Sequence, residues 1–116
     1  MHNFKELDVW KKAIEFSTTI YQITESFPNQ EKYGLISQIN RSCVSIPSNI
    51  AEGAGRNGNK EFQQFLGYAL ASSFELETQL IIAKNINYLK LDVFEQLILK
   101  LNEIQRMLVG LKKSIK

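Results

Sequence analysis

Cysteine and histidine are almost absent from this 116-residue sequence, which contains one of each, Cys43 and His2. A single cysteine excludes a disulfide within the chain and is typical of a reducing compartment. A single histidine excludes the paired Glu-x-x-His motifs that hold two metal ions in helical bundles. We therefore expect a protein without a metal or other cofactor.

Long apolar runs and a strong charge of one sign are also missing. The longest apolar stretches fall far short of a membrane span, and residues 1–10 lack the apolar run of a signal peptide. The net charge of +2, from 14 basic and 12 acidic residues, is too small to indicate a partner by itself. These features predict one cytoplasmic domain over residues 1–116, with no membrane contact.

Helical spacing of apolar residues appears four times, whereas no alternating apolar run indicates a strand. The first segment covers residues 3–27, and the second starts near residue 29 and ends within the stretch "EGAGRNGN". The third covers about 59–87 and the fourth 91–115. Asn3 with Glu6 resembles a capping box for the first segment, and Asn29 is a plausible N-cap for the second. Short connections between long amphipathic helices predict an all-α fold, an antiparallel up-down-up-down four-helix bundle.

Each segment carries an apolar stripe with spacings of three and four, which marks the face expected in the core. The expected core residues are Val9, Ala13, Phe16, Ile20, Ile23 and Phe27, then Ile36, Ile39, Cys43, Ile46 and Ile50, then Phe62, Leu66, Ala69, Ser73, Leu76, Leu80 and Ala83, and finally Phe94, Leu97, Leu101, Ile104, Leu108, Leu111 and Ile115. Apolar residues outside these stripes, among them Val44, Phe74 and Ile81, predict a further interface and hence association of subunits.

Pro47 lies inside the second segment, where a proline removes a backbone donor and costs about 3 kcal/mol in an exposed helix. The apolar stripe nevertheless stays in phase across it, from Cys43 through Ile46 to Ile50. We therefore expect one long helix, kinked at Pro47. The carbonyl of Cys43 then needs a replacement donor, which a serine hydroxyl, an ordered water or a neighbouring helix would supply.

Polar residues form a second stripe beside the apolar one, again with spacings of three and four. Its members are Ser42, Ser45, Asn49, Glu52 and Arg56. One interpretation is a solvated face. The other is a hydrogen-bonded seam to another helix or subunit, because small serine and asparagine side chains allow close packing. The candidate partners for such a seam are Glu75, Glu77 and Gln79 of the third segment.

Residue patterns of common catalytic sites are not found. Cys43 lies on an expected core stripe, so we interpret it as a small apolar residue and not as a nucleophile. Glu75 and Glu77 are two positions apart on a helix and therefore point to different faces. The stretch "GAGRNG" has no preceding strand and lacks the Gly-Lys-Ser/Thr ending of a phosphate-binding loop. We predict that the protein is not an enzyme.

Four stretches carry a resemblance to a known family: "FKELDVWKKAIEF", "FPNQEKYGLISQINRSCVSIPSNIAEGAGR", "EFQQFLGYALASSFELETQL" and "INYL". Together they resemble the four-helix bundle proteins encoded in intervening sequences of bacterial 23S ribosomal RNA genes. That family is in turn similar to the accessory variability protein of diversity-generating retroelements, a basic pentameric barrel that binds nucleic acid and a reverse transcriptase. The resemblance implies a bacterial homopentamer of antiparallel four-helix subunits, with no known catalytic activity.

Two functions follow as hypotheses. The first is a nucleic-acid-associated scaffold, with RNA or DNA as partner, in which basic residues contact phosphates. The candidate residues are Lys11, Lys12, Arg41, Arg56, Lys112 and Lys113. A solvated helix face, or favourable charge at a helix C-terminus, explains the same lysine clusters without a ligand. The second hypothesis is a module that assembles and recruits a partner protein without binding nucleic acid.

Overall fold

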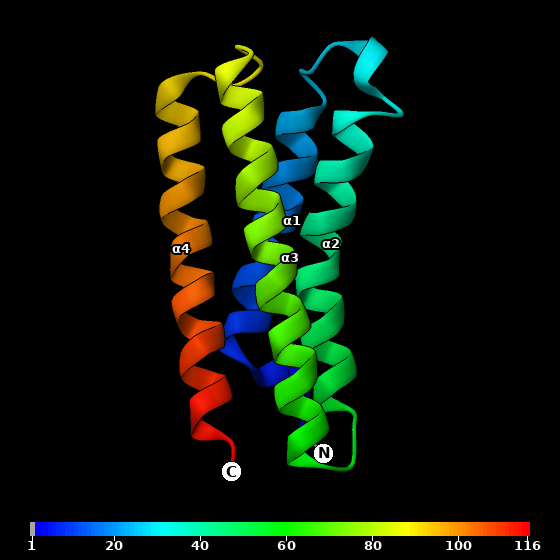
Figure 1. The fold of residues 1–116 in the computed structure, drawn as a ribbon, viewed down its shortest axis with the longest axis vertical. Helices are drawn as coiled ribbons and strands as arrows, with labels where there is room; N and C mark the ends of the chain where they lie inside the picture. Colours follow the sequence, from blue (N-terminus) through cyan, green and yellow to red (C-terminus); the bar gives the residue numbers. More distant parts are fainter. Residues whose placement is uncertain (1) are drawn as a thin grey trace.

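The computed structural model describes residues 2–116, which form four long helices (Figure 1). Two single-turn 3-10 helices, η1 (Phe4–Glu6) and η2 (Asn29–Glu31), precede the first and second of them. The long helices are α1 (Asp8–Thr24), α2 (Leu35–Ala54), α3 (Asn59–Asn85) and α4 (Leu91–Ser114). Residues 2–116 contain no strand, so the predicted all-α four-helix bundle is confirmed.

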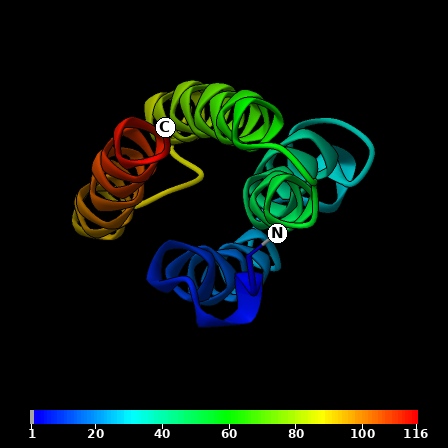
Figure 2. The ribbon, with the colours of Figure 1, turned by 90° about the horizontal axis from the view of Figure 1, so that it is seen from below.

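Sequential helices are neighbours around the bundle, as the end-on view in Figure 2 shows. The chain reverses at every connection, so α1 and α3 climb in Figure 1 while α2 and α4 descend. Contacts at the two ends agree with this arrangement. At one end the Asn59 Nδ2 donates to the Lys116 carbonyl at 2.8 Å, and at the other the Tyr88 hydroxyl donates to Glu31 at 2.9 Å.

The core follows the stripes expected from the sequence. All of the stripe residues are buried except Ile23, Ile36, Phe94 and Leu111, which are half-buried. The same spacing in the sequence predicts a second apolar stripe in the first segment, formed by Leu7, Trp10, Ile14, Ser17 and Tyr21. This stripe is only partly covered, since Ile14 is 40% exposed and Tyr21 is 48% exposed. The wide apolar face of α1 therefore exceeds what the subunit core covers.

The helix starts differ from the sequence prediction. The Asn3 side chain accepts from the Lys5 backbone N–H and thus caps η1, whereas α1 begins separately at Asp8. Asn29 does not cap α2, because η2 and a turn intervene and Gly34 holds the N-cap position. The side chain of Glu31 accepts from the Leu35 N–H at 3.3 Å and supplies the missing cap from outside the helix.

Pro47 is buried inside α2, and the helix continues through it as expected; the kink itself stays a prediction. The carbonyl of Cys43 would normally accept from residue 47, which has no N–H. The Ser17 hydroxyl of α1 lies 3.2 Å from that carbonyl and also 2.8 Å from the carbonyl of Ala13. A serine of the neighbouring helix is thus the replacement donor, shared between two acceptors.

The turn between α3 and α4 depends on Asn87, the one non-glycine residue within residues 2–116 that has a positive φ, 67°. Asparagine tolerates this left-handed conformation. The Asn87 N–H bonds to the Lys84 carbonyl and the Tyr88 N–H to the Ala83 carbonyl, which satisfies the free end of α3. This geometry accounts for the stretch "INYL" and places Tyr88 against Glu31.

Candidate functional site

The first turns of α3 carry exposed cationic and aromatic side chains. Lys60, Gln64 and Tyr68 follow one another on the side of α3 that faces away from the core. We call the surface formed by these residues and their neighbours the α3 face. It consists of Arg56, Lys60, Gln64, Phe65, Tyr68 and Lys112.

Arg56 forms the edge of the α3 face beside α2. Its guanidinium lies 4.7 Å from the centroid of the Phe65 ring, and a nitrogen lies 3.9 Å from a carboxylate oxygen of Glu61. Both partners of this ion pair are about half exposed, so its contribution to stability is small. Within the subunit Arg56 therefore contacts Glu61 and Phe65 of α3, and a seam with Glu75, Glu77 or Gln79 stays a prediction.

Gly53 determines how closely Phe65 approaches this edge. A Cβ atom at residue 53 would lie 2.6 Å from the Cβ of Phe65 and 3.0 Å from a ring carbon of Phe62. Only glycine therefore permits α2 and α3 to approach this closely. The loop that follows α2 leaves the helix pair at this point, which sets Arg56 over the Phe65 ring.

Tyr68 is the exposed aromatic residue of the α3 face, with 46% of its surface accessible. Its ring contacts that of Phe65 edge-on, at 5.4 Å between centroids and 78° between planes. Gln64 donates to the Tyr68 hydroxyl at 2.7 Å, so the tyrosine lies back along α3 over the preceding turn. Arg56, Phe65 and Tyr68 thus form one contiguous group.

Lys112 forms the opposite edge of the α3 face, beside α4. The side-chain nitrogen of Gln63 donates to the carbonyls of Lys112 and Ile115, at 3.2 Å and 2.5 Å, and holds the end of α4 against α3. The Lys112 ammonium lies 3.4 Å from the position that a Cβ of Gly67 would occupy. Because Gly67 has no side chain, the ammonium reaches the surface of α3.

The other cationic residues named from the sequence do not join this cluster. Lys11 is exposed on α1, and Arg41 is exposed on the first half of α2. Lys113 is exposed on the last turn of α4. Lys12 is paired with Glu103 of α4 at 3.3 Å. The structure therefore brings Arg56 and Lys112 to the two edges of one surface and leaves Lys11, Lys12 and Arg41 on other helices.

Sequence reasoning did not name Lys60 or Tyr68 as candidate site residues. The signal was present in the phase of the third segment, because residues 60, 64 and 68 share a stripe opposite Phe62, Leu66 and Ala69. Tyr68 is an aromatic residue on that outward stripe, whereas Phe62 lies on the core stripe.

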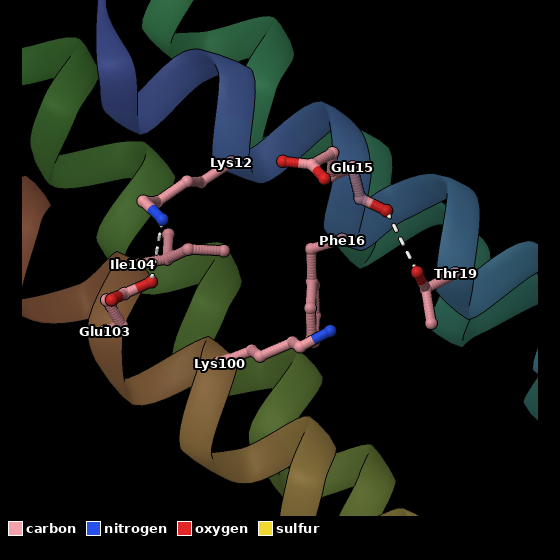
Figure 3. Close-up of a pocket in the computed structure, with 7 residues that line it drawn as sticks. All are labelled: Lys12, Glu15, Phe16, Thr19, Lys100, Glu103 and Ile104. Atoms are coloured by element: carbon pink, nitrogen blue, oxygen red, sulfur yellow. Dashed lines mark hydrogen bonds and ion pairs between the residues drawn. The ribbon is translucent and has the colours of Figure 1, made fainter.

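A pocket of about 200 Å³ lies between α1 and α4 (Figure 3). Phe16 and Ile104 line it with Thr19, and its charged lining residues are Lys12, Glu15, Lys100 and Glu103. The two ammonium and two carboxylate groups balance in charge. No cysteine, histidine or serine lines the pocket, and its one hydroxyl, that of Thr19, donates to the Glu15 carbonyl of its own helix at 3.2 Å.

Cys43 is the single cysteine of the sequence, and it is buried. Burial raises the pKa of its thiol to about 11, and the neighbouring Ser17 side chain acts in the opposite direction. At neutral pH the thiol is therefore protonated and unreactive. Residues 2–116 contain no group of three or more metal-ligating side chains. None of the helices in this part of the chain has the length and apolar character that a membrane span requires.

The polar stripe of α2 is satisfied largely within the subunit. The Ser45 and Ser72 hydroxyls lie 2.8 Å apart across α2 and α3, and Asn49 donates to the Ser45 carbonyl at 2.8 Å. Ser42 is buried and donates to the Gln38 carbonyl of its own helix at 3.0 Å.

Of the other residues proposed for the seam, Glu52 and Glu75 are exposed. Gln79 is buried, and its Oε1 has no hydrogen-bond partner within residues 2–116.

A shallow apolar groove follows α3 and α4 above the α3 face. Leu70, Phe74 and Val109 line it, with Asn102, Gln105 and Arg106 along its α4 side. Phe74 is 52% exposed and Val109 is 37% exposed. Exposed apolar side chains therefore lie beside polar ones in this groove.

Comparisons with known proteins agree with the resemblance seen in the four sequence stretches. The chain is similar to a protein of unknown function from the S23 ribosomal protein family of Bacteroides thetaiotaomicron. The two share 27% identity and a TM-score of 0.84, over 90% of this chain and 95% of that one. No curated protein matches the sequence. A family model described as 23S rRNA-intervening sequence protein matches residues 5–110, from η1 to the last turns of α4, and the chain therefore belongs to that family.

Proposed function

We propose that this protein is a non-catalytic, oligomeric scaffold that binds RNA through the α3 face, in connection with a 23S rRNA intervening sequence. The observation that carries the proposal is the placement of Arg56, Lys60 and Lys112 around one exposed surface. Lysine and arginine side chains on such a surface contact phosphates, which supply most of the affinity of non-specific nucleic-acid binding. Repetition of the surface in an oligomer would multiply these contacts.

Charge reversal on the α3 face tests this proposal. We expect the triple variant Arg56→Glu, Lys60→Glu and Lys112→Glu to bind a mixed-sequence RNA far more weakly at about 50 mM salt. If each cation contacts one phosphate, the slope of log affinity against log salt should become shallower by about 2. Fluorescence anisotropy measures both quantities, and circular dichroism verifies the helical fold.

A second triple variant is the matched control for the same change in net charge. Lys11→Glu, Arg41→Glu and Lys90→Glu alter exposed residues on α1, on α2 and at the start of α4, away from the α3 face. This variant should keep the salt slope of the unmodified protein. Equal losses of RNA affinity in the two variants would mean that RNA binds elsewhere on the protein. No RNA binding by the unmodified protein at low salt would reject RNA association.

The alternative function, recruitment of a partner protein, is favoured by the exposed groove along α3 and α4. Leu70, Phe74 and Val109 give it an apolar floor, and exposed apolar patches mark protein interfaces. Partner binding that is insensitive to salt and to the α3-face charge reversal would support this function over RNA binding.

We further propose that the subunits assemble into a homopentamer. Val44, Phe74 and Ile81 are between 38% and 52% exposed, as are Ile14 and Tyr21 of α1, so the subunit leaves apolar surface uncovered on several helices. A cyclic ring covers such surfaces by repeated head-to-tail contacts. Light scattering should give a mass five times the 13.3 kDa of the chain. A mass of one chain would contradict association, and a dimer or tetramer would contradict the ring of five.

A further inference from the structure

The α3 face combines its cations with π surfaces, which a purely electrostatic contact to a nucleic-acid backbone does not require. Nearly half of Tyr68 is exposed, and its hydroxyl is held by Gln64 at 2.7 Å. The guanidinium of Arg56 already lies over the Phe65 ring at 4.7 Å, with its own position exposed to solvent. Both groups are therefore ordered by neighbours before any ligand binds, which lowers the entropy cost of binding.

Groups of this kind select between forms of RNA. In a duplex the bases stack on each other, and the deep, narrow major groove keeps side chains from their edges, so recognition uses the backbone and the minor groove. Unpaired bases expose their faces and stack on tyrosine rings and on arginine guanidinium planes. Tyr68 and Arg56 offer one surface of each type within the same contiguous group.

The cations of the α3 face are arranged to accompany such a strand. Lys60 lies one turn before Gln64 on the outward stripe of α3, and Lys112 reaches the surface of the same helix at Gly67. Lys60 thus begins the outward stripe that leads to Tyr68, and the Lys112 ammonium lies beside this stripe. A strand that places a base on Tyr68 would bring its neighbouring phosphates towards these lysines.

We propose that the α3 face binds an unpaired segment of RNA, with a base stacked on Tyr68, a second base on Arg56, and flanking phosphates at Lys60 and Lys112. This inference rests on the RNA association proposed above and assigns the form of RNA that the site takes. It predicts little sequence preference, because every base has a face on which to stack.

The experiment compares one RNA strand of about 12 nucleotides, mixed in sequence, with the same strand annealed to its complement. We expect the single strand to bind more tightly at equal salt. Tyr68→Ala should weaken single-strand binding by about 5- to 150-fold, the range for losing one stacked base, and should leave duplex binding unchanged. Tyr68→Phe keeps the ring but loses the hydrogen bond from Gln64, so it should weaken single-strand binding much less than Tyr68→Ala does.

Tyr33→Ala is the matched control, because Tyr33 is 88% exposed and lies in the turn between η2 and α2, at the opposite end of α2 from Arg56. This variant should bind both RNAs normally. Equal affinity for single strand and duplex, or an unchanged affinity in Tyr68→Ala, would overturn the inference while leaving RNA association intact. If the unmodified protein binds neither RNA, both this inference and the proposed RNA association are overturned. The same holds if the α3 face binds a protein partner and no RNA.

Discussion

Replacement of Leu101 by alanine should lower the free energy of unfolding by about 2–5 kcal/mol. Leu101 lies at the centre of α4 with none of its surface exposed. Truncation removes buried methyl and methylene groups and leaves a cavity that the surrounding helices fill only in part. Urea denaturation followed by circular dichroism measures the loss.

Leu99 of the same helix is the control, because it is 71% exposed. Leu99→Ala makes the same chemical change where there is little packing to lose, so we expect a change within about 0.5 kcal/mol. A similar cost for both variants would mean that α4 has a different phase in solution, or that Leu99 is buried in an oligomer. Dilution of the protein separates these two explanations, because only the second depends on concentration.

Replacement of Ser17 by alanine should lower the free energy of unfolding by about 1–3 kcal/mol, although it removes a single oxygen atom. The Ser17 hydroxyl is the donor that reaches the Cys43 carbonyl, at 3.2 Å, in place of the N–H that Pro47 lacks. Without it a buried acceptor has no partner, which costs more than the loss of an average hydrogen bond. Thr18→Ala is the control, since the exposed Thr18 hydroxyl bonds only within α1.

A double-mutant cycle identifies the cause of the Ser17 effect. In a Pro47→Ala background residue 47 regains an N–H, which can donate to the Cys43 carbonyl as in an ordinary helix. Ser17→Ala should then cost measurably less than it does in the unmodified protein, and we expect a coupling energy of about 1 kcal/mol. Additive effects in urea denaturation would show that the hydroxyl does not substitute for the missing donor.

Much of the fold is readable from the sequence because the helices are amphipathic with steady spacing. Apolar residues three and four apart identify the buried face of each helix without knowledge of its neighbours. Pro47 did not obscure α2, since Cys43, Ile46 and Ile50 stay in phase across it. The helix starts were less predictable. Asn3 and Asn29 have good capping side chains, but local turns place them on η1 and η2 instead of α1 and α2.

The sequence by itself thus determined four amphipathic helices, their core faces, the need for a replacement donor near Pro47 and the absence of a recognisable catalytic motif. Only the tertiary structure decided which side chains meet. Ser17 donates to the Cys43 carbonyl because α1 packs on α2. Arg56 contacts Phe65 because Gly53 allows α2 to approach α3 closely. Lys112 lies at the same surface because α4 packs on the other side of α3. Sequence periodicity describes one helix at a time. Contacts between helices depend on the distance between each pair of helices and on their relative shift along the bundle axis, and both are decided by the packing of all four helices together.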